Sequence, residues 1–102
     1  MIRHIVFFRA RRREDVGEIL VGLSLLKQNP HAQRLEVALN GRMDQLGNEV
    51  DVVVYGEFAD RDALAAYKTH PIYMESIERV RPLRDLRYAA DFEMVEGYSV
   101  RL

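Results

Sequence analysis

Residues 51–71 read DVVVYGEFADRDALAAYKTHP, a run that holds a strand, a helix start and a helix stop. The β-branched and aromatic residues of 51–58 predict a strand. Asp60 then makes a good N-cap for the helix that carries Tyr67, and Pro71 ends or kinks that helix. A strand followed directly by a capped helix is the unit around which the rest of the chain is arranged.

The segments before this unit add two strands and a helix. Ile2–Arg9 (IRHIVFFR) is rich in β-branched and aromatic residues and predicts a strand. Apolar residues then recur at helical spacing over Glu14–Gln28, and Asn29-Pro30 supplies the stop. Arg34–Leu39 alternates with period two, as a strand does, and residues 40–49 are rich in turn formers.

The segments after this unit complete the pattern. Pro71 suits the first position of a second helical piece, Ile72–Arg81, which Pro82 ends. Leu86–Val95 predicts the last strand. The order β-α-β-β-α-β is that of a ferredoxin-like α+β fold, with a four-stranded antiparallel sheet and its helices on one face. We expect residues 1–102 to form one domain of this kind.

The first strand predicts how the sheet is covered. It is apolar on both faces, with Ile2, Val6 and Phe8 on one and Ile5 and Phe7 on the other. Helices on one side of the sheet cover only one of these faces. A domain this small also buries only about 60 to 65% of the surface that its unfolded chain exposes. A twofold-related copy would cover the second face, so we predict a homodimer through the sheet.

Composition excludes several classes of protein. The 15 basic and 16 acidic residues are mixed along the chain, which predicts no nucleic-acid partner, and the run Arg11–Arg13 is expected to be solvated. The absence of cysteine excludes disulfides, thiolate catalysis and Cys-based metal sites. No segment approaches the ~18 apolar residues that span a bilayer, and no cleavage pattern follows MIRHIVFF. We therefore expect a soluble, unprocessed, cytoplasmic protein without a membrane partner.

Tyr67 and His70 are the first candidates for a functional site. On a continuous helix they share a face one turn apart, and a titratable ring at a helix end is a plausible wall of a pocket. The alternative is that Tyr67 belongs to the core and His70 caps a turn. Both interpretations stay open at this point, and His31, beside Pro30 in a loop, is expected to be solvated.

Three strings, taken in order, resemble the stress-responsive A/B barrel (Dabb) domain family. They are MIRHIVFF at the start, DVVVYGEFADRDALAAYKTHP in the middle and RVRPLRDLRYAADFE near the end. The resemblance covers nearly the whole chain. It implies a ferredoxin-like fold that dimerises sheet to sheet, as a dimeric α/β barrel, with a cavity between sheet and helices. It leaves the activity open, because the family includes stress proteins, many members without an assigned activity and one polyketide cyclase, and fold does not choose among them.

The cyclase resemblance is partial. It implies a pocket with a first-strand histidine, a helix tyrosine and a last-strand aspartate, and His4, Tyr67 and Asp91 match these. Where the family often has a second, catalytic histidine, this chain has Tyr73. A phenol has a pKa of about 10, so Tyr73 could act as a base near neutral pH only if that pKa were lowered by several units. The nearby carboxylate of Asp91 would raise it instead. We therefore predict that Tyr73 donates a hydrogen bond to Asp91 and that the known cyclase mechanism does not carry over.

Three classes of function remain. A binding protein would hold a small apolar or aromatic molecule in a pocket of about 300 Å³ or more. An enzyme of the lyase, isomerase or cyclase type would add His4 or His70 as the group that moves a proton, with Tyr67 and Tyr73 as neutral donors. A structural stress or accessory protein would have its pocket filled by its own bulky aromatic side chains, for which the candidates are Phe7, Phe8, Tyr67, Tyr73, Tyr88 and Phe92. The predicted pocket residues are His4, Tyr67, His70, Tyr73 and Asp91. No cofactor is predicted, and no metal, because His4, His70 and Asp91 are a poor ligand set.

Overall fold

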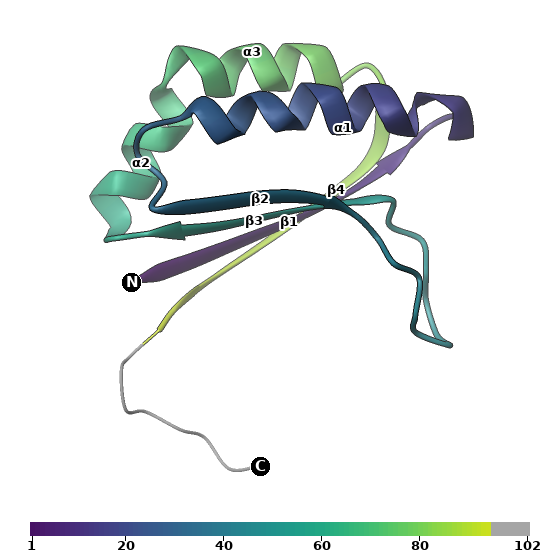
Figure 1. Ribbon diagram of the computed structural model, residues 1–102, viewed down its shortest axis with the longest axis horizontal. Coiled ribbons are helices and arrows are strands. Elements are labelled where there is room, and N and C mark those ends of the chain that lie inside the picture. Colours follow the sequence, from purple (N-terminus) through teal and green to yellow (C-terminus); the bar gives the residue numbers. More distant parts are fainter. Residues whose placement is uncertain (95–102) are drawn as a thin grey trace.

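A computed structural model describes residues 1–94 of the chain and has the predicted element order (Figure 1). The strands are β1 (Ile2–Ala10), β2 (Arg34–Leu39), β3 (Val52–Phe58) and β4 (Arg84–Glu93), and the helices are α1 (Val16–Ser24), α2 (Arg61–Thr69) and α3 (Pro71–Val80). Two short 3-10 turns, η1 (Arg13–Asp15) and η2 (Leu25–Gln28), flank α1. The strands form one antiparallel sheet in the order β2-β3-β1-β4, and the helices cover one face of it (Figure 1). The ferredoxin-like prediction is confirmed.

Helix ends lie where the capping residues predict them. The Asp60 carboxylate accepts a hydrogen bond from the Ala63 amide at 2.8 Å and so starts α2. Pro71 occupies the first turn of α3, as expected. The helix predicted over residues 14–28 is confirmed in extent, although its two ends are 3-10 rather than α.

The last strand differs from its prediction. It begins at Arg84 rather than at Leu86, because a turn at residues 81–83 leads directly into pairing with β1. The pairing register shifts between Arg9 and Ala10, so that Arg9 lies opposite Leu86 while Ala10 lies opposite Arg84. Asp85 is the extra residue of a β-bulge. Val95, the predicted end of this strand, lies outside the described residues.

The core lies between the helices and the sheet, on the face of β1 that carries Ile2, Val6 and Phe8. These side chains are buried, as are the side chains of β3 that pack beside them, Val52, Val54 and Phe58. α1, η2 and α3 close the core from above with Ile19, Leu23, Leu26 and Val80. Strand alternation therefore sends one set of side chains into this layer and leaves the other on the open face.

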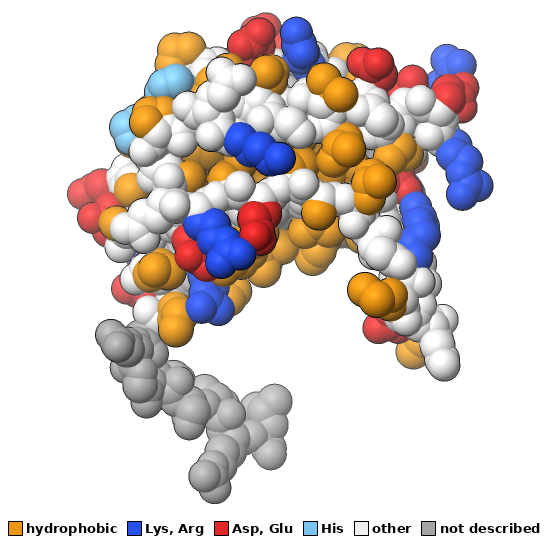
Figure 2. All heavy atoms as spheres, in the orientation of Figure 1, with side chains coloured by type: hydrophobic (Ala, Val, Ile, Leu, Met, Phe, Trp, Pro, Cys, Tyr) orange, Lys and Arg blue, Asp and Glu red, His pale blue; other side chains and the backbone are white. Residues whose placement is uncertain are grey.

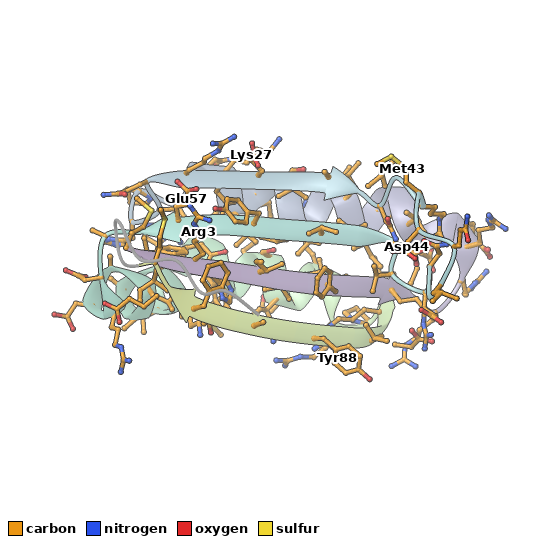
Figure 3. The ribbon with its side chains drawn as sticks, turned by 90° about the horizontal axis from the view of Figure 1, so that it is seen from below. Arg3, Lys27, Met43, Asp44, Glu57 and Tyr88 are labelled. Atoms are coloured by element: carbon orange, nitrogen blue, oxygen red, sulfur yellow. The ribbon has the colours of Figure 1, made fainter. Side chains whose placement is uncertain are left out.

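The open face is the side of the sheet that the helices leave bare (Figure 3). Ile5 and Phe7 are half-buried there, and Tyr88 is 66% exposed at the β4 edge. Figure 2 shows hydrophobic side chains gathered beneath the edge of the sheet. None of the helices of residues 1–94 has the length and apolar character that crossing a membrane would require.

Candidate functional site

A cavity of about 340 Å³ lies between α3 and the helix-covered face of the sheet. Its walls come from every layer of the fold: Val6, Phe8 and Val54 from the sheet, Leu23 and Leu26 from α1 and η2, and Tyr73, Ser76, Ile77 and Val80 from α3. His4 of β1 and Tyr67 of α2 complete the inner wall. The site thus brings together residues that are far apart in the chain around a space of the size that small ligands occupy.

His4 is the buried titratable group of this wall. Its side chain points to the helix-covered face because it shares that face with the buried residues of β1, and it is 1% exposed. Pairing of β1 with β4 places His4 opposite Asp91, and the His4 Nδ1–H donates to the Asp91 carboxylate at 2.5 Å. This bond fixes the tautomer and leaves Nε2 without a hydrogen-bond partner among residues 1–94.

The surroundings of His4 keep its ring neutral over a wide pH range. Burial has the largest influence and lowers the pKa of His4 below its usual 6.5, because the charged form loses its hydration. Asp91 opposes this through its hydrogen bond and its charge, while the nearby cations Lys68 and Arg87 lower the pKa further. A neutral imidazole at neutral pH has a free nitrogen that can accept a proton.

Two tyrosines stand beside His4. The Tyr67 ring lies with its centroid 6.2 Å from that of His4, and the Tyr73 ring lies 5.1 Å from that of Tyr67, both in edge-to-face geometry. Burial, followed by the neighbouring Tyr73, strongly raises the pKa of Tyr67, so its phenol stays protonated. Buried Asn29 holds this part of α2 in place by donating to the Tyr67 carbonyl oxygen at 3.0 Å.

The structure brings together only part of the predicted site. His4, Tyr67 and Tyr73 line the cavity, and Asp91 lies behind His4 as its hydrogen-bond partner. The hydrogen bond predicted from Tyr73 to Asp91 is not found among residues 1–94, where His4 is the donor to Asp91 instead.

His70 does not line the cavity. Its backbone is extended, and its Nδ1 accepts a hydrogen bond from the Ile72 amide at 3.1 Å, which makes it the N-cap of α3. Its ring lies 5.9 Å from that of His31, which is also not a wall residue of the cavity. The capping interpretation of His70 fits the structure, and the pocket interpretation does not.

The sequence interpretation missed five polar residues of the cavity wall. Four are basic, Lys68, Arg81, Arg84 and Arg87, and the fifth is buried Ser76, which donates to the Gly22 carbonyl oxygen at 2.9 Å. The recurring arginines in RVRPLRDLR were a visible signal. Two arginines three residues apart in a regular strand would point to opposite faces, so the pattern did not indicate one site.

The polar groups that line the cavity are one imidazole, two phenols, one hydroxyl group and four basic side chains. Within residues 1–94, no three His, Asp or Glu side chains lie close enough together to hold a metal ion. The chemistry that the arrangement can supply is a hydrogen bond from a phenol, proton transfer at an imidazole and attraction of negative charge.

Comparison with known proteins agrees with this architecture. Residues 2–94 match the family model of the Stress responsive A/B Barrel Domain. Curated proteins give no significant match to the chain.

Solved structures share the fold at low sequence identity. A dimeric ferredoxin-like protein of unknown function from Thermobifida fusca is 23% identical, covers 91% of this chain and 90% of its own, and superposes with a TM-score of 0.76. A dimeric protein of unknown function with a ferredoxin-like fold from Bacteroides fragilis is 25% identical, with 91% and 95% covered and a TM-score of 0.70. A Dabb family protein with a ferredoxin-like fold from Mesorhizobium loti is 20% identical, with 92% and 96% covered and a TM-score of 0.77.

Proposed function

Because the chain belongs to the stress responsive A/B barrel domain family, we propose that it is a homodimer that binds a small apolar or aromatic molecule in the cavity beneath α3. The observation that carries the proposal is the cavity itself. It has a volume of about 340 Å³ although three aromatic side chains, Phe8, Tyr67 and Tyr73, stand in its walls. A hollow of this size, lined largely by apolar side chains with a few polar groups, has the character of a small-molecule binding site.

The open space argues against a filled-cavity protein with a purely structural role. Of the aromatic residues that were candidates to fill it, Phe7, Tyr88 and Phe92 belong to the opposite face of the sheet, because they alternate with the residues that point toward the helices. Those three side chains lie where the second copy of the proposed dimer would pack. They supply apolar surface on the open face, where Tyr88 and Phe92 are exposed.

A second copy packed on the open face would cover this surface. Two of the structurally similar proteins are described as dimeric, which supports the same assembly for this chain. Arg3 Nε adds an observation from the chain itself: it lies on the open face, is buried, and has no hydrogen-bond acceptor among residues 1–94. A partner copy would bring an acceptor to it.

Ligand binding is tested by filling the cavity from one helix. Ile77 lines it from α3, while Met74 on the same helix is 48% exposed and does not. We expect the neutral apolar probe N-phenyl-1-naphthylamine to bind the native protein and the Met74→Phe variant with a rise in fluorescence. The Ile77→Phe variant should lose this binding, because the larger ring occupies the ligand volume. No binding to the native protein, or equal binding to the Ile77→Phe variant, would contradict the proposal.

The pair of His4 and Asp91 favours a second candidate, an enzyme that moves a proton on the bound molecule. In a lyase, isomerase or cyclase reaction, His4 Nε2 would take a proton from carbon beside a carbonyl group, and the Tyr67 or Tyr73 hydroxyl would donate a hydrogen bond to the carbonyl oxygen. Any turnover of a ligand recovered from the native protein, followed by mass spectrometry, should vanish in the His4→Ala variant. It should persist in the His70→Ala variant, because His70 lies outside the cavity. Full turnover by the His4→Ala variant would rule out this role.

A further inference from the structure

Charge is distributed unevenly along the cavity. The most deeply buried side chains of its wall, each no more than 2% exposed, are those of His4, Val54, Tyr67, Ser76 and Val80. The four basic residues of the wall lie nearer to solvent, since Lys68 and Arg81 are exposed and Arg84 and Arg87 are half-buried. No aspartate or glutamate lines this cavity within residues 1–94. The cavity therefore has a buried, mainly apolar body, and these four basic side chains form a cationic mouth on the side that meets solvent.

The bulge in β4 is what assembles this mouth. Arg84 and Arg87 are three residues apart, and a regular strand would turn them to opposite faces of the sheet. Because Asp85 is the extra residue of the bulge, Arg84 comes to lie opposite Ala10 and Arg87 opposite Phe8, which both belong to the helix-covered face of β1. Asp85 itself is drawn to the other side, where its carboxylate accepts from Arg9 Nε at 2.8 Å.

The cations of the mouth lack counter-ions. Four arginines elsewhere in the structure pair with carboxylates: Arg9 with Asp85, Arg12 with Glu14, Arg34 with Glu36 and Arg42 with Asp51. Five others, Arg3, Arg11, Arg13, Arg61 and Arg79, lie outside the cavity and form no ion pair within residues 1–94. Within residues 1–94, no carboxylate forms an ion pair with Lys68, Arg81, Arg84 or Arg87, and Asp91 is engaged by His4. Burial and then the neighbouring guanidinium groups of Arg87, Arg81 and Arg11 lower the pKa of Arg84.

Arg87 is also placed so that it can serve a ligand inside. Its guanidinium carbon lies 5.9 Å from the centre of the Phe8 ring, and Phe8 is a wall of the cavity. Contact with an aromatic face restrains the planar group without using its N–H donors. A guanidinium held in this way presents its fork of donors to an oxyanion, for which two parallel hydrogen bonds are the preferred geometry.

We infer that the molecule bound in this cavity is an amphipathic anion, with an apolar or aromatic body among the buried side chains and a terminal oxyanion such as a carboxylate between Arg84 and Arg87. This inference rests on the proposed function and specifies the class of ligand that the cavity binds. An anion at the mouth supplies the missing counter-charge, while the body of the molecule is removed from water.

The experiment compares two probes that differ only at the end group, 4-butylbenzoate and 4-butylbenzamide, by NMR titration of the isotope-labelled native protein. We expect the carboxylate to bind about 10- to 100-fold more tightly than the amide, the range that a charged hydrogen bond supplies. In the Arg84→Gln/Arg87→Gln double variant this preference should disappear while the amide binds as before. The Arg79→Gln variant removes a positive charge from an exposed residue of α3 that does not line the cavity, and it should keep the preference. Salt should weaken binding of the carboxylate more than binding of the amide.

The outcomes separate this inference from the proposed function. If both probes bind equally to the native protein, or if the double variant keeps the preference, the anion inference is overturned and the ligand cavity stands. If neither probe nor N-phenyl-1-naphthylamine binds, the cavity proposal fails and the inference fails with it. Circular dichroism checks the fold of the double variant, and Arg84→Lys provides a milder change that keeps the charge but removes the fork, for which we expect an intermediate preference.

Discussion

Single residues of the site owe their properties to opposing influences. His4 is buried, which favours the neutral ring, and it donates to Asp91, which favours the charged ring. Burial is the largest single influence, Lys68 and Arg87 act in the same direction, and the net result is a lowered pKa. Burial also favours the neutral form of Tyr67, because it raises the pKa of the phenol and keeps it protonated. The wall of the cavity is thus uncharged at neutral pH, while the mouth is cationic.

The first prediction concerns the titration of His4. We expect its pKa, measured by NMR of the imidazole C–H groups, to lie below 6.5, and the Asp91→Asn variant to lower it further because the partner that favours the charged ring is removed. In the window between that lowered pKa and 6.5, the unfolded chain binds more protons than the folded one. Stability should therefore be full above pH 6.5 and decline as the pH falls through this window, by about 1.4 kcal/mol for each pH unit that the window spans. The signals are assigned with the His31→Gln and His70→Gln variants, and a pKa above 6.5 would mean that Asp91 outweighs burial.

Residue patterns predicted some of this wall and missed part of it. The prediction that joined His70 to Tyr67 assumed that one helix continues through both, so that residues three apart share a face. The α2 helix ends at Thr69, and His70 has an extended backbone with φ −70° and ψ 142°. Residue spacing no longer fixes direction across such a break, so the imidazole turns to the start of α3 instead.

At the scale of elements, close packing of α1 against α3 sets the roof of the cavity. Gly22 of α1 faces Val80 and Arg79 of α3, and a Cβ atom placed on Gly22 would lie 2.9 Å from a methyl carbon of Val80. Ser76 reinforces the same contact through its hydrogen bond to the Gly22 carbonyl oxygen. The two glycines of α1 therefore have different roles, because nothing lies within 4 Å of a Cβ atom built on Gly17.

This difference makes a matched pair of alanine substitutions informative. We expect Gly22→Ala to lower the free energy of unfolding by about 1–2 kcal/mol, because the gain in helix propensity is smaller than the cost of forcing α1 and α3 apart. Gly17→Ala should raise it by about 0.5 kcal/mol, because it restricts the unfolded chain without a clash. Urea denaturation measures both. A stabilised Gly22→Ala variant would show that Val80 moves aside freely and that the helices are not in close contact.

Elements and their caps were predictable because their determinants are local. Asp60 at the start of α2 and Pro71 at the start of α3 act within one helical turn of themselves. The bulge at Asp85 was not predictable, because it arises where β4 pairs with β1 and leaves no mark in the alternation of β4 itself.

At the scale of the whole molecule, one sheet serves two faces with different tasks. The helix-covered face lines the cavity. The open face presents Ile5 and Phe7 on the inner strand β1 and Phe92 on the edge strand β4. Tyr88 lies on the same edge strand (Figure 3). Surface of this kind is costly to leave in water and is typical of an interface between subunits. The proposed dimer would cover this surface, so that the sheet is buried on both faces.

The dimer is tested by placing a charge at the centre of the open face. Phe7 lies between Val53 of β3 and Tyr88 of β4, so a Phe7→Glu variant would bury unpaired carboxylates in the interface. We expect the native protein to elute as a dimer, and the variant as a folded monomer, in size-exclusion chromatography with light scattering. The control Val21→Glu changes an exposed residue of α1 and should stay dimeric. A native monomer, or a dimeric Phe7→Glu variant, would contradict the sheet-to-sheet assembly.

The order of strands and helices, the caps that bound α2 and α3, and the two-sided apolar character of β1 all follow from the sequence alone. These features depend on side chains within a few residues of each other, so the residue pattern predicts them without knowledge of the tertiary structure. Which of the candidate residues meet at the cavity was settled by tertiary structure. His4 and Asp91 are 87 positions apart in the chain and are joined by strand pairing. Arg84 and Arg87 face the same side because of a bulge in that pairing. Both depend on long-range register, which local patterns do not encode.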